Sequence, residues 1–148
     1  MAPQSLPKIN PGDRAILAGR TGSGKSTLAR FLLERSPGHW VILNPKGTKA
    51  YDKLPDINTI NGFDLKKIGK SIEKHRFTNI VPSLNQSNAD TMDAFIMWLH
   101  GEYTDIGLVS DELYTLHNNG VAKQGLIGWL TRGRELKQSF LGLTQRQK

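Results

Sequence analysis

The sequence predicts an α/β protein built on a mainly parallel sheet. Three observations carry this prediction: short apolar strands alternate with helical patterns, a glycine-rich loop joins the first strand to the first helix, and a later apolar strand ends in two acids. Alternation of this kind is typical of parallel sheets covered by helices. At 148 residues, 37% of them hydrophobic, the chain is long enough for one domain with a buried core.

Composition excludes several classes of protein. There are no cysteines, so disulfides and thiolate metal sites are excluded. The N-terminus lacks the features of a signal peptide, and no run approaches the ~20 apolar residues of a membrane span. We therefore expect a soluble, cytoplasmic protein. The 20 Lys and Arg residues exceed the 13 Asp and Glu residues, and the net charge of +7 favours a polyanionic partner such as nucleic acid.

The chain begins with a segment, 1–13, that is rich in proline and polar residues. We expect it to be a flexible arm ahead of a domain at 14–148. The apolar run 15–18 predicts the first strand, and the apolar spacing after residue 25 predicts a helix to about residue 35. Between them the sequence fits the pattern G-x-x-x-x-G-K-[ST], in which glycines let successive N–H groups turn toward phosphate oxygens.

This glycine-rich loop predicts a nucleotide site. Lys25 suits the β- and γ-phosphates, Ser26 suits a Mg²⁺ ion, and the start of the helix suits an anion. We expect ATP and Mg²⁺ to be held by nine residues of this segment: Gly19, Arg20, Thr21, Gly22, Ser23, Gly24, Lys25, Ser26 and Thr27.

The middle of the chain alternates strands and helices. The patterns place strands at 40–43, 58–60 and 77–81, and helices that begin near 65 and 90. The helix that begins near 65 carries a basic face of four lysines, Lys66, Lys67, Lys70 and Lys74. That face either contacts DNA phosphates or is simply solvated, and we favour the solvated interpretation.

The apolar strand predicted at 106–110 ends in Asp111 and Glu112. An acid at the carboxyl end of a buried strand lies beside the phosphate loop in folds of this kind. Asp111 then holds Mg²⁺, often through water, and Glu112 polarises the water that attacks the γ-phosphate. Acid pairs are common on surfaces, but one that closes an apolar strand behind a phosphate loop favours a functional role.

The remainder of the chain predicts a helix over 121–137 and a strand over 139–143. Gln145 follows that strand, where an amide would sense the γ-phosphate or hold the attacking water. A terminal glutamine on its own carries no such meaning.

Five ordered segments together resemble the FtsK/HerA superfamily of DNA-pumping ATPases, and most of all the small genome-packaging ATPases of phages and viruses. They are 19–26, 44–47, 111–114, 132–136 and 144–146. The resemblance implies a P-loop NTPase fold of the RecA/ASCE-like type, a three-layer sandwich. It also implies an ATP-hydrolysing motor in the host cytoplasm or the virion, assembled as a homo-oligomeric ring, a hexamer or similar, that threads double-stranded DNA. In such a ring, Arg132 or Arg134 reaches the neighbouring subunit's site.

The sequence departs from the family at two places. Asn44 stands where relatives usually carry an acid before Pro-Lys-Gly, which puts the role of that acid in doubt. The sequence also stops at Lys148, where relatives continue with a further helix and strand, so we expect a form truncated or reduced at the C-terminus. The strand before the glycine-rich loop would then be an open edge of the sheet.

Three other functions are alternatives to an ATP-hydrolysing DNA motor. A nucleotide or small-molecule kinase also uses a glycine-rich phosphate loop, but an acid pair suited to activating water argues against it. A regulatory GTPase needs an Asn/Thr-Lys-x-Asp motif, and the nearest string, 48–51, lacks the aspartate. A non-catalytic ATP-binding assembly module stays open.

Overall fold

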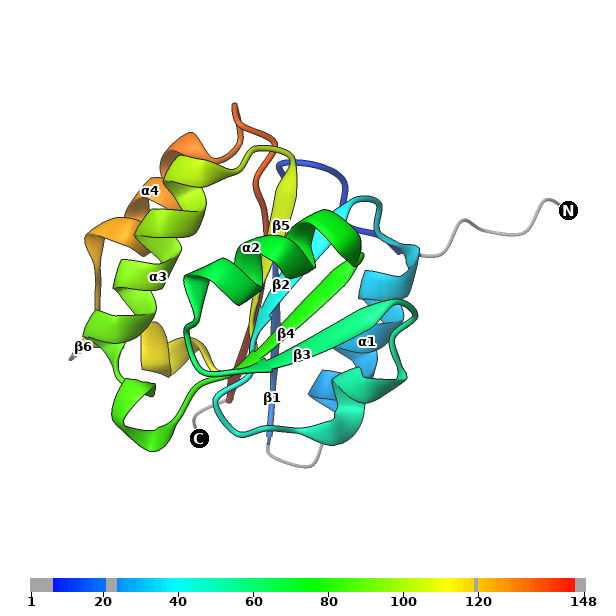
Figure 1. The fold of residues 1–148 in the computed structure, drawn as a ribbon, viewed down its shortest axis with the longest axis horizontal. Coiled ribbons are helices and arrows are strands. Elements are labelled where there is room, and N and C mark those ends of the chain that lie inside the picture. Colours follow the sequence, from blue (N-terminus) through cyan, green and yellow to red (C-terminus); the bar gives the residue numbers. More distant parts are fainter. Residues whose placement is uncertain (1–6, 21–23, 119, 146–148) are drawn as a thin grey trace, which may run out of the picture.

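A six-stranded parallel sheet organises the protein, in a computed structural model that describes residues 7–20, 24–118 and 120–145 (Figure 1). The strands run in the order β1-β8-β5-β2-β4-β3. They are β1 (Arg14–Gly19), β2 (His39–Leu43), β3 (Ile57–Asn61), β4 (Phe77–Val81), β5 (Ile106–Ser110) and β8 (Ser139–Gln145). Because every pairing in this sheet is parallel, all the carboxyl ends of its strands lie along one end of the molecule.

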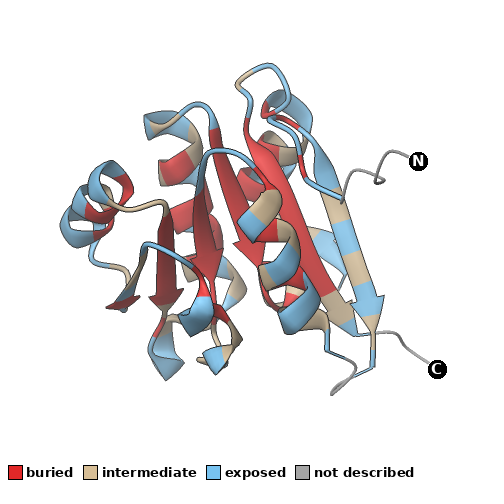
Figure 2. Cartoon of the chain, turned by 90° about the vertical axis from the view of Figure 1, so that its right-hand side faces the viewer, coloured by how far each residue is buried: buried red, intermediate tan, exposed pale blue. Residues whose placement is uncertain are grey.

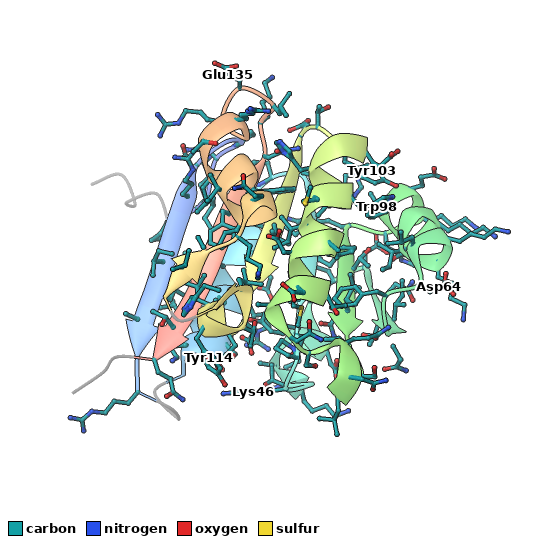
Figure 3. All side chains as sticks on the ribbon, turned by 90° about the vertical axis from the view of Figure 1, so that its left-hand side faces the viewer. Lys46, Asp64, Trp98, Tyr103, Tyr114 and Glu135 are labelled. Carbon is teal, nitrogen blue, oxygen red and sulfur yellow. The ribbon has the colours of Figure 1, made fainter. Side chains whose placement is uncertain are left out.

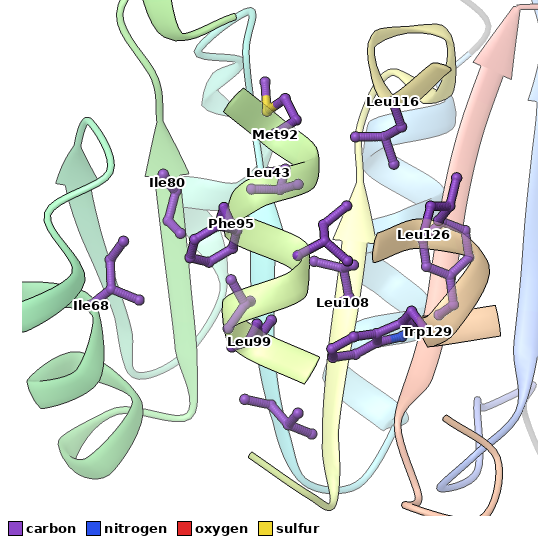
Figure 4. Close-up of a cluster of buried hydrophobic side chains, with 14 of the residues drawn as sticks. Leu43, Ile68, Ile80, Met92, Phe95, Leu99, Leu108, Leu116, Leu126 and Trp129 are labelled. Atoms are coloured by element: carbon purple, nitrogen blue, oxygen red, sulfur yellow. The ribbon is translucent and has the colours of Figure 1, made fainter. Parts of the chain in front are cut away.

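Helices cover both faces of the sheet and give three layers. The helices are α1 (Lys25–Arg35), α2 (Leu65–Lys74), α3 (Ala89–Glu102) and α4 (Gln124–Arg132). α1 packs on one face through Ala29 and Leu33, whereas α2, α3 and α4 pack on the other (Figure 1). Figure 4 shows the apolar cluster on the second face, to which Phe95, Leu108 and Trp129 all belong. The predicted α/β sandwich with a mainly parallel sheet is confirmed.

Short elements complete the connections. Three 3₁₀ turns are η1 (Lys49–Lys53), η2 (Leu84–Gln86) and η3 (Leu113–Leu116), and a small antiparallel hairpin pairs β6 (His117–Asn118) with β7 (Val121–Ala122). None of the helices in the described part of the chain is long and apolar enough to cross a bilayer.

The two edges of the sheet differ from its centre. The central strands β2 and β5 are buried almost throughout, as continuous apolar runs predict, whereas β1 alternates between exposed and half-buried residues (Figure 2). Within the described residues β1 pairs with β8 alone, and Ile16 is 55% exposed. Within the described residues β1 is therefore an edge strand of the sheet, and the predicted truncation stays a prediction.

The helix predicted over 121–137 is wrong at both ends. Val121 belongs to the β6–β7 hairpin, and α4 starts only at Gln124, where a side chain from α3 accepts the first free N–H groups. The helix stops at Arg132 because Gly133 turns the chain: its carbonyl accepts hydrogen bonds from the N–H groups of Leu136 and Gln138, which leads into β8.

The described part of the N-terminal segment, residues 7–13, contacts the domain. Ile9 is buried, and its N–H donates to Ser36 Oγ over 2.8 Å. The N–H of Gly12 donates to Ser139 Oγ over 3.0 Å. The boundary proposed at residue 13 stays a prediction.

Candidate nucleotide site

A cavity opens at the carboxyl ends of the strands, where β1, β8, β5 and β2 stand side by side. Its volume is about 360 Å³, within the range of small-molecule sites. Side chains predicted at separate points of the sequence line it together: Gly24, Lys25, Ser26, Thr27, Asp111, Glu112 and Gln145. The parallel sheet therefore brings the two halves of the predicted site to one place.

The glycine-rich loop leads from β1 into α1. Gly24 is the N-cap of α1 with φ 84°, a left-handed conformation that glycine adopts without steric cost, and no side chain caps the helix. The first N–H groups of α1 are thus not capped by a side chain, as an anion site at a helix start requires. Arg20 is exposed and does not line the cavity, and the predicted Thr21, Gly22 and Ser23 lie outside the described residues.

Lys25 bridges two strand ends. Its Nζ donates to the carbonyl of Gly19 at the end of β1, over 2.8 Å, and to the carbonyl of Thr144 near the end of β8, over 3.0 Å. Lys25 also lines the cavity, and two carbonyl oxygens accept hydrogen bonds from its ammonium group. A phosphate placed there would compete with these two hydrogen bonds for the same cation.

Asp111 is held by two hydroxyl groups. Ser26 Oγ donates to Asp111 Oδ1 over 3.0 Å, and the buried hydroxyl of Tyr51 donates to the same oxygen over 2.6 Å. Burial raises the pKa of Asp111, an effect that these two hydrogen bonds oppose and the neighbouring charge of Glu112 reinforces. Burial, followed by the charge of Asp111, also raises the pKa of the Tyr51 phenol, so that it stays a hydrogen-bond donor.

Ser26 and Asp111 together fit a magnesium ion. The Ser26 hydroxyl and the Asp111 carboxylate are the hard oxygen donors that Mg²⁺ prefers, and they lie within hydrogen-bond distance of each other. No group of three or more His, Cys, Asp or Glu side chains able to hold a metal occurs among the residues that the structure describes. One or two protein ligands completed by phosphate oxygens and water is the usual arrangement for Mg²⁺.

Glu112 is paired with Lys46, a residue of the segment 44–47 for which the sequence predicts no role of its own. Lys46 Nζ lies 2.5 Å from Glu112 Oε2, and the glutamate is 3% exposed. The hydrogen bond to Glu112 raises the pKa of Lys46. The ion pair with Lys46 occupies one oxygen of the Glu112 carboxylate.

Lys46 and Tyr51 both come from the connection after β2. β2 pairs with β5, with Leu43 opposite Ser110, so this connection starts beside the two acids. Asn44 is buried and closes the turn: its side chain accepts from the N–H of Thr48 and donates to the carbonyl of Thr48. The contacts of Lys46 and Tyr51 with the two acids could not be predicted, because the sequence does not reveal that β2 and β5 are adjacent in the sheet.

The remaining predicted residues lie at two different places. Gln145 ends β8, opposite Gly19 in register, and lines the cavity, while its sensing role stays a prediction. Arg132, the last residue of α4, and Arg134, just beyond it, are exposed. Both lie close to the amino ends of the strands, since the N–H of Asp105 just before β5 donates to the carbonyl of Leu136. Figure 3 shows Glu135 at the opposite end of the molecule from Lys46. Neither arginine reaches the cavity of its own chain.

The fold and the arrangement of its loop, lysine and acids define the P-loop NTPase class. β8 separates β1, which leads into the phosphate loop, from β5, which carries the acids, as in the RecA/ASCE-like branch. A scan against protein-family models and a search of curated proteins gave no match.

Solved structures similar to this chain include genome-packaging NTPases of two Sulfolobus viruses. The chain is similar to B204 of Sulfolobus turreted icosahedral virus 2 in its complex with sulfate (TM-score 0.67) and in its complex with ATPγS (TM-score 0.61), each at 20% identity over 93% of this chain. It is also similar to B204, the DNA-packaging ATPase of Sulfolobus turreted icosahedral virus, at 17% identity, 93% coverage and a TM-score of 0.63. The chain spans 66% to 68% of the length of these proteins. At this identity the likeness establishes the fold.

Proposed function

We propose that this protein binds Mg·ATP, hydrolyses it, and uses the energy to move double-stranded DNA, as a motor of the viral genome-packaging type. The observation that carries the proposal is the meeting of Lys25, Ser26, Asp111 and Glu112 around one cavity. The similar solved structures support it, because they are named as packaging NTPases and include complexes with ATPγS and AMPPCP.

Each residue of the cavity has a distinct role in this proposal. Lys25 exchanges its two carbonyl partners for phosphate oxygens, and Ser26 and Asp111 hold the metal. When bound, Mg²⁺ supplies positive charge that stabilises the transferred phosphoryl group. Glu112 takes a proton from the water that attacks the γ-phosphorus as the bond to the ADP oxygen breaks. Gln145 contacts the γ-phosphate or that water.

The assembly is a homo-oligomeric ring, a hexamer or similar, in the host cytoplasm or the virion. A ring gives the exposed Arg132 and Arg134 a target, because in their own chain they lie at the opposite end from the cavity. The net charge of +7 fits a ring that holds double-stranded DNA by its phosphates.

The test is ATP turnover with and without double-stranded DNA. Glu112→Gln should keep nucleotide binding and lose hydrolysis, because the amide keeps the shape of the side chain but cannot accept the proton. Lys25→Ala should lose on the order of 2–4 kcal/mol of binding or turnover, since it removes a charge-assisted phosphate contact. Glu102→Gln, an exposed residue at the end of α3 that does not line the cavity, is the matched control and should behave as the unchanged protein.

The outcomes also separate the alternatives. Phosphate that appears on a small acceptor rather than in water would identify a nucleotide or small-molecule kinase. Tight ATP binding without any turnover, with or without DNA, would identify an assembly module. If the Lys25→Ala and Glu112→Gln proteins both turn over ATP normally, the cavity is not the active site.

A further inference from the structure

A second hollow lies between α2 and β3, at the opposite edge of the sheet from β1. Its volume is about 440 Å³. Lys67, Lys70 and Lys74 of α2 line one side of it, and Asn58 and Asn61 of the edge strand line the other. We call this hollow the α2–β3 groove; it shares no residue with the nucleotide cavity.

The three lysines stand on a helix that is fixed to the core. Ile68 and Ile72 of α2 are buried in the apolar cluster, and the buried hydroxyl of Ser71 shares a 2.7 Å hydrogen bond with that of Thr78 in β4. Asp64 caps the helix by accepting from the N–H of Lys67 (Figure 3). The positive charges are thus presented by a rigid element, which lowers the entropy lost on binding a partner.

The positive charge of the groove is not neutralised within the described part of the chain. Lys67, Lys70 and Lys74 are exposed, and none of them forms an ion pair with a described acid. No Asp or Glu is among the described residues that line the groove. A hollow of this composition attracts a polyanion, because its polar lining carries three ammonium groups and no carboxylate.

The spacing of the lysines suits a repeating phosphate chain. They follow one another at i, i+3 and i+7, which places them on one side of the helix. At 1.5 Å per residue, Lys67 and Lys74 are about 10 Å apart along the helix axis. Phosphates of one strand of duplex DNA advance about 3.4 Å per base pair, so the lysines extend over roughly three base pairs.

We infer that the α2–β3 groove is a contact surface for the phosphate backbone of duplex DNA. The lysines bind phosphates as point charges, and the amide of Asn58, on the same strand face as the buried Ile60, adds a neutral hydrogen-bond donor. The contact therefore positions the duplex without selecting its sequence. The choice of DNA among polyanions rests on the proposed function. The groove itself rests on the geometry and charge of α2 and β3.

The experiment compares two variants that each lose three exposed lysines. One is Lys67→Ala/Lys70→Ala/Lys74→Ala, in the groove. The matched control is Lys8→Ala/Lys53→Ala/Lys66→Ala, whose lysines are exposed and do not line the groove. Binding of a short mixed-sequence DNA duplex is measured from about 50 to about 200 mM salt, the range over which counterion release changes affinity strongly.

The groove variant should bind the duplex more weakly at the low-salt end of this range, and its plot of log K against log salt should be less steep by about 2.7, because each lost phosphate contact removes about 0.9 from the slope. The control should keep the slope of the unchanged protein. Both variants should keep ATP turnover measured without DNA and the same unfolding midpoint, since none of these lysines lines the nucleotide cavity.

Two results would overturn the inference, and they bear differently on the proposed function. Equal slopes in the groove variant and the control would remove the groove as the contact but leave a DNA-dependent ATPase intact. No salt-dependent duplex binding by the unchanged protein, with ATP turnover present, would remove both the groove and the DNA part of the proposed function.

Discussion

Tyr51 controls the orientation of Asp111 from within the core. Tyr51→Phe keeps the ring and removes one of the two hydrogen bonds that Asp111 Oδ1 accepts from Tyr51 and Ser26. A hydrogen bond to a charged group contributes about 1.5–3 kcal/mol. We therefore expect the Mg²⁺ concentration needed for nucleotide binding to rise about tenfold, the equivalent of about 1.4 kcal/mol.

The measurement is a Mg²⁺ titration of binding to a fluorescent ATP analogue, followed by turnover. Tyr114→Phe removes a hydroxyl from an exposed tyrosine and is the control. An unchanged Mg²⁺ requirement in Tyr51→Phe would show that the hydroxyl only fills space.

The burial of Asp111 makes stability depend on pH. Because burial raises its pKa above the ordinary value of 3.8, the folded protein holds this proton at pH values where the unfolded chain has lost it. Stability contributed by the group is therefore full below 3.8 and is lost as the pH rises through the raised pKa.

Asp111→Asn removes that titration and should increase the free energy of unfolding at pH 7, measured by urea denaturation without Mg²⁺. The gain should shrink as the pH approaches 3.8, where the native carboxyl is protonated. An increase in the free energy of unfolding that is larger at low pH than at pH 7 would contradict a raised pKa of Asp111. The same variant should lose Mg²⁺-dependent turnover, so stability and activity move in opposite directions.

At the scale of elements, α3 fixes the start of α4. The carboxylate of Asp93 in α3 is 7% exposed, and its two oxygens accept the N–H groups of Gly125 and Leu126, each over 3.0 Å. Asp93→Asn places an NH₂ group against one of these donors, and we expect a loss of about 1–3 kcal/mol in the free energy of unfolding.

Asp90→Asn is the comparison, because Asp90 lies on the same helix and pairs with Lys123 at 2.7 Å but has a side chain that is 83% exposed. An exposed ion pair contributes at most about 1 kcal/mol. Urea denaturation of both variants gives the two values. Equal losses would mean that the buried cap does not set the position of α4.

The elements predicted well are those that the local sequence defines. The run 77–81 became β4 without change, because an apolar segment closed by proline needs no distant partner to be recognised. The start of α4 was not predictable in this way, since its cap comes from Asp93, some thirty residues earlier. Lys46 and Tyr51 were missed for the same reason: their contacts with Glu112 and Asp111 depend on which strands are neighbours.

At the scale of the whole molecule, the two arginines raise the question of a partner subunit. Arg132 ends α4 and Arg134 follows it, so the two no longer share one helical wheel, and both are exposed. We favour Arg134 as the residue that reaches a neighbour's phosphates. An arginine supplied in trans is worth about 10³-fold or more in rate, so Arg134→Ala should be nearly inactive alone.

The deciding experiment mixes Arg134→Ala chains with Lys25→Ala chains. Each chain then carries what the other lacks, and partial ATPase activity from two inactive proteins would indicate a shared site. Full activity of Arg134→Ala alone would exclude this residue and leave Arg132 for the same test.

The position of β8 has a consequence for synthesis of the protein. Arg14 of β1 pairs with Phe140 of β8. β1 is synthesised before the other described strands and β8 after them, so β1 has no partner strand until β8 has been synthesised. Pairings so distant in sequence form slowly. Until β8 docks, Lys25 has no Thr144 carbonyl to bind, and the pocket lacks the wall that carries Gln145. A growing chain therefore cannot complete this pocket until β8 has been synthesised and has joined the sheet.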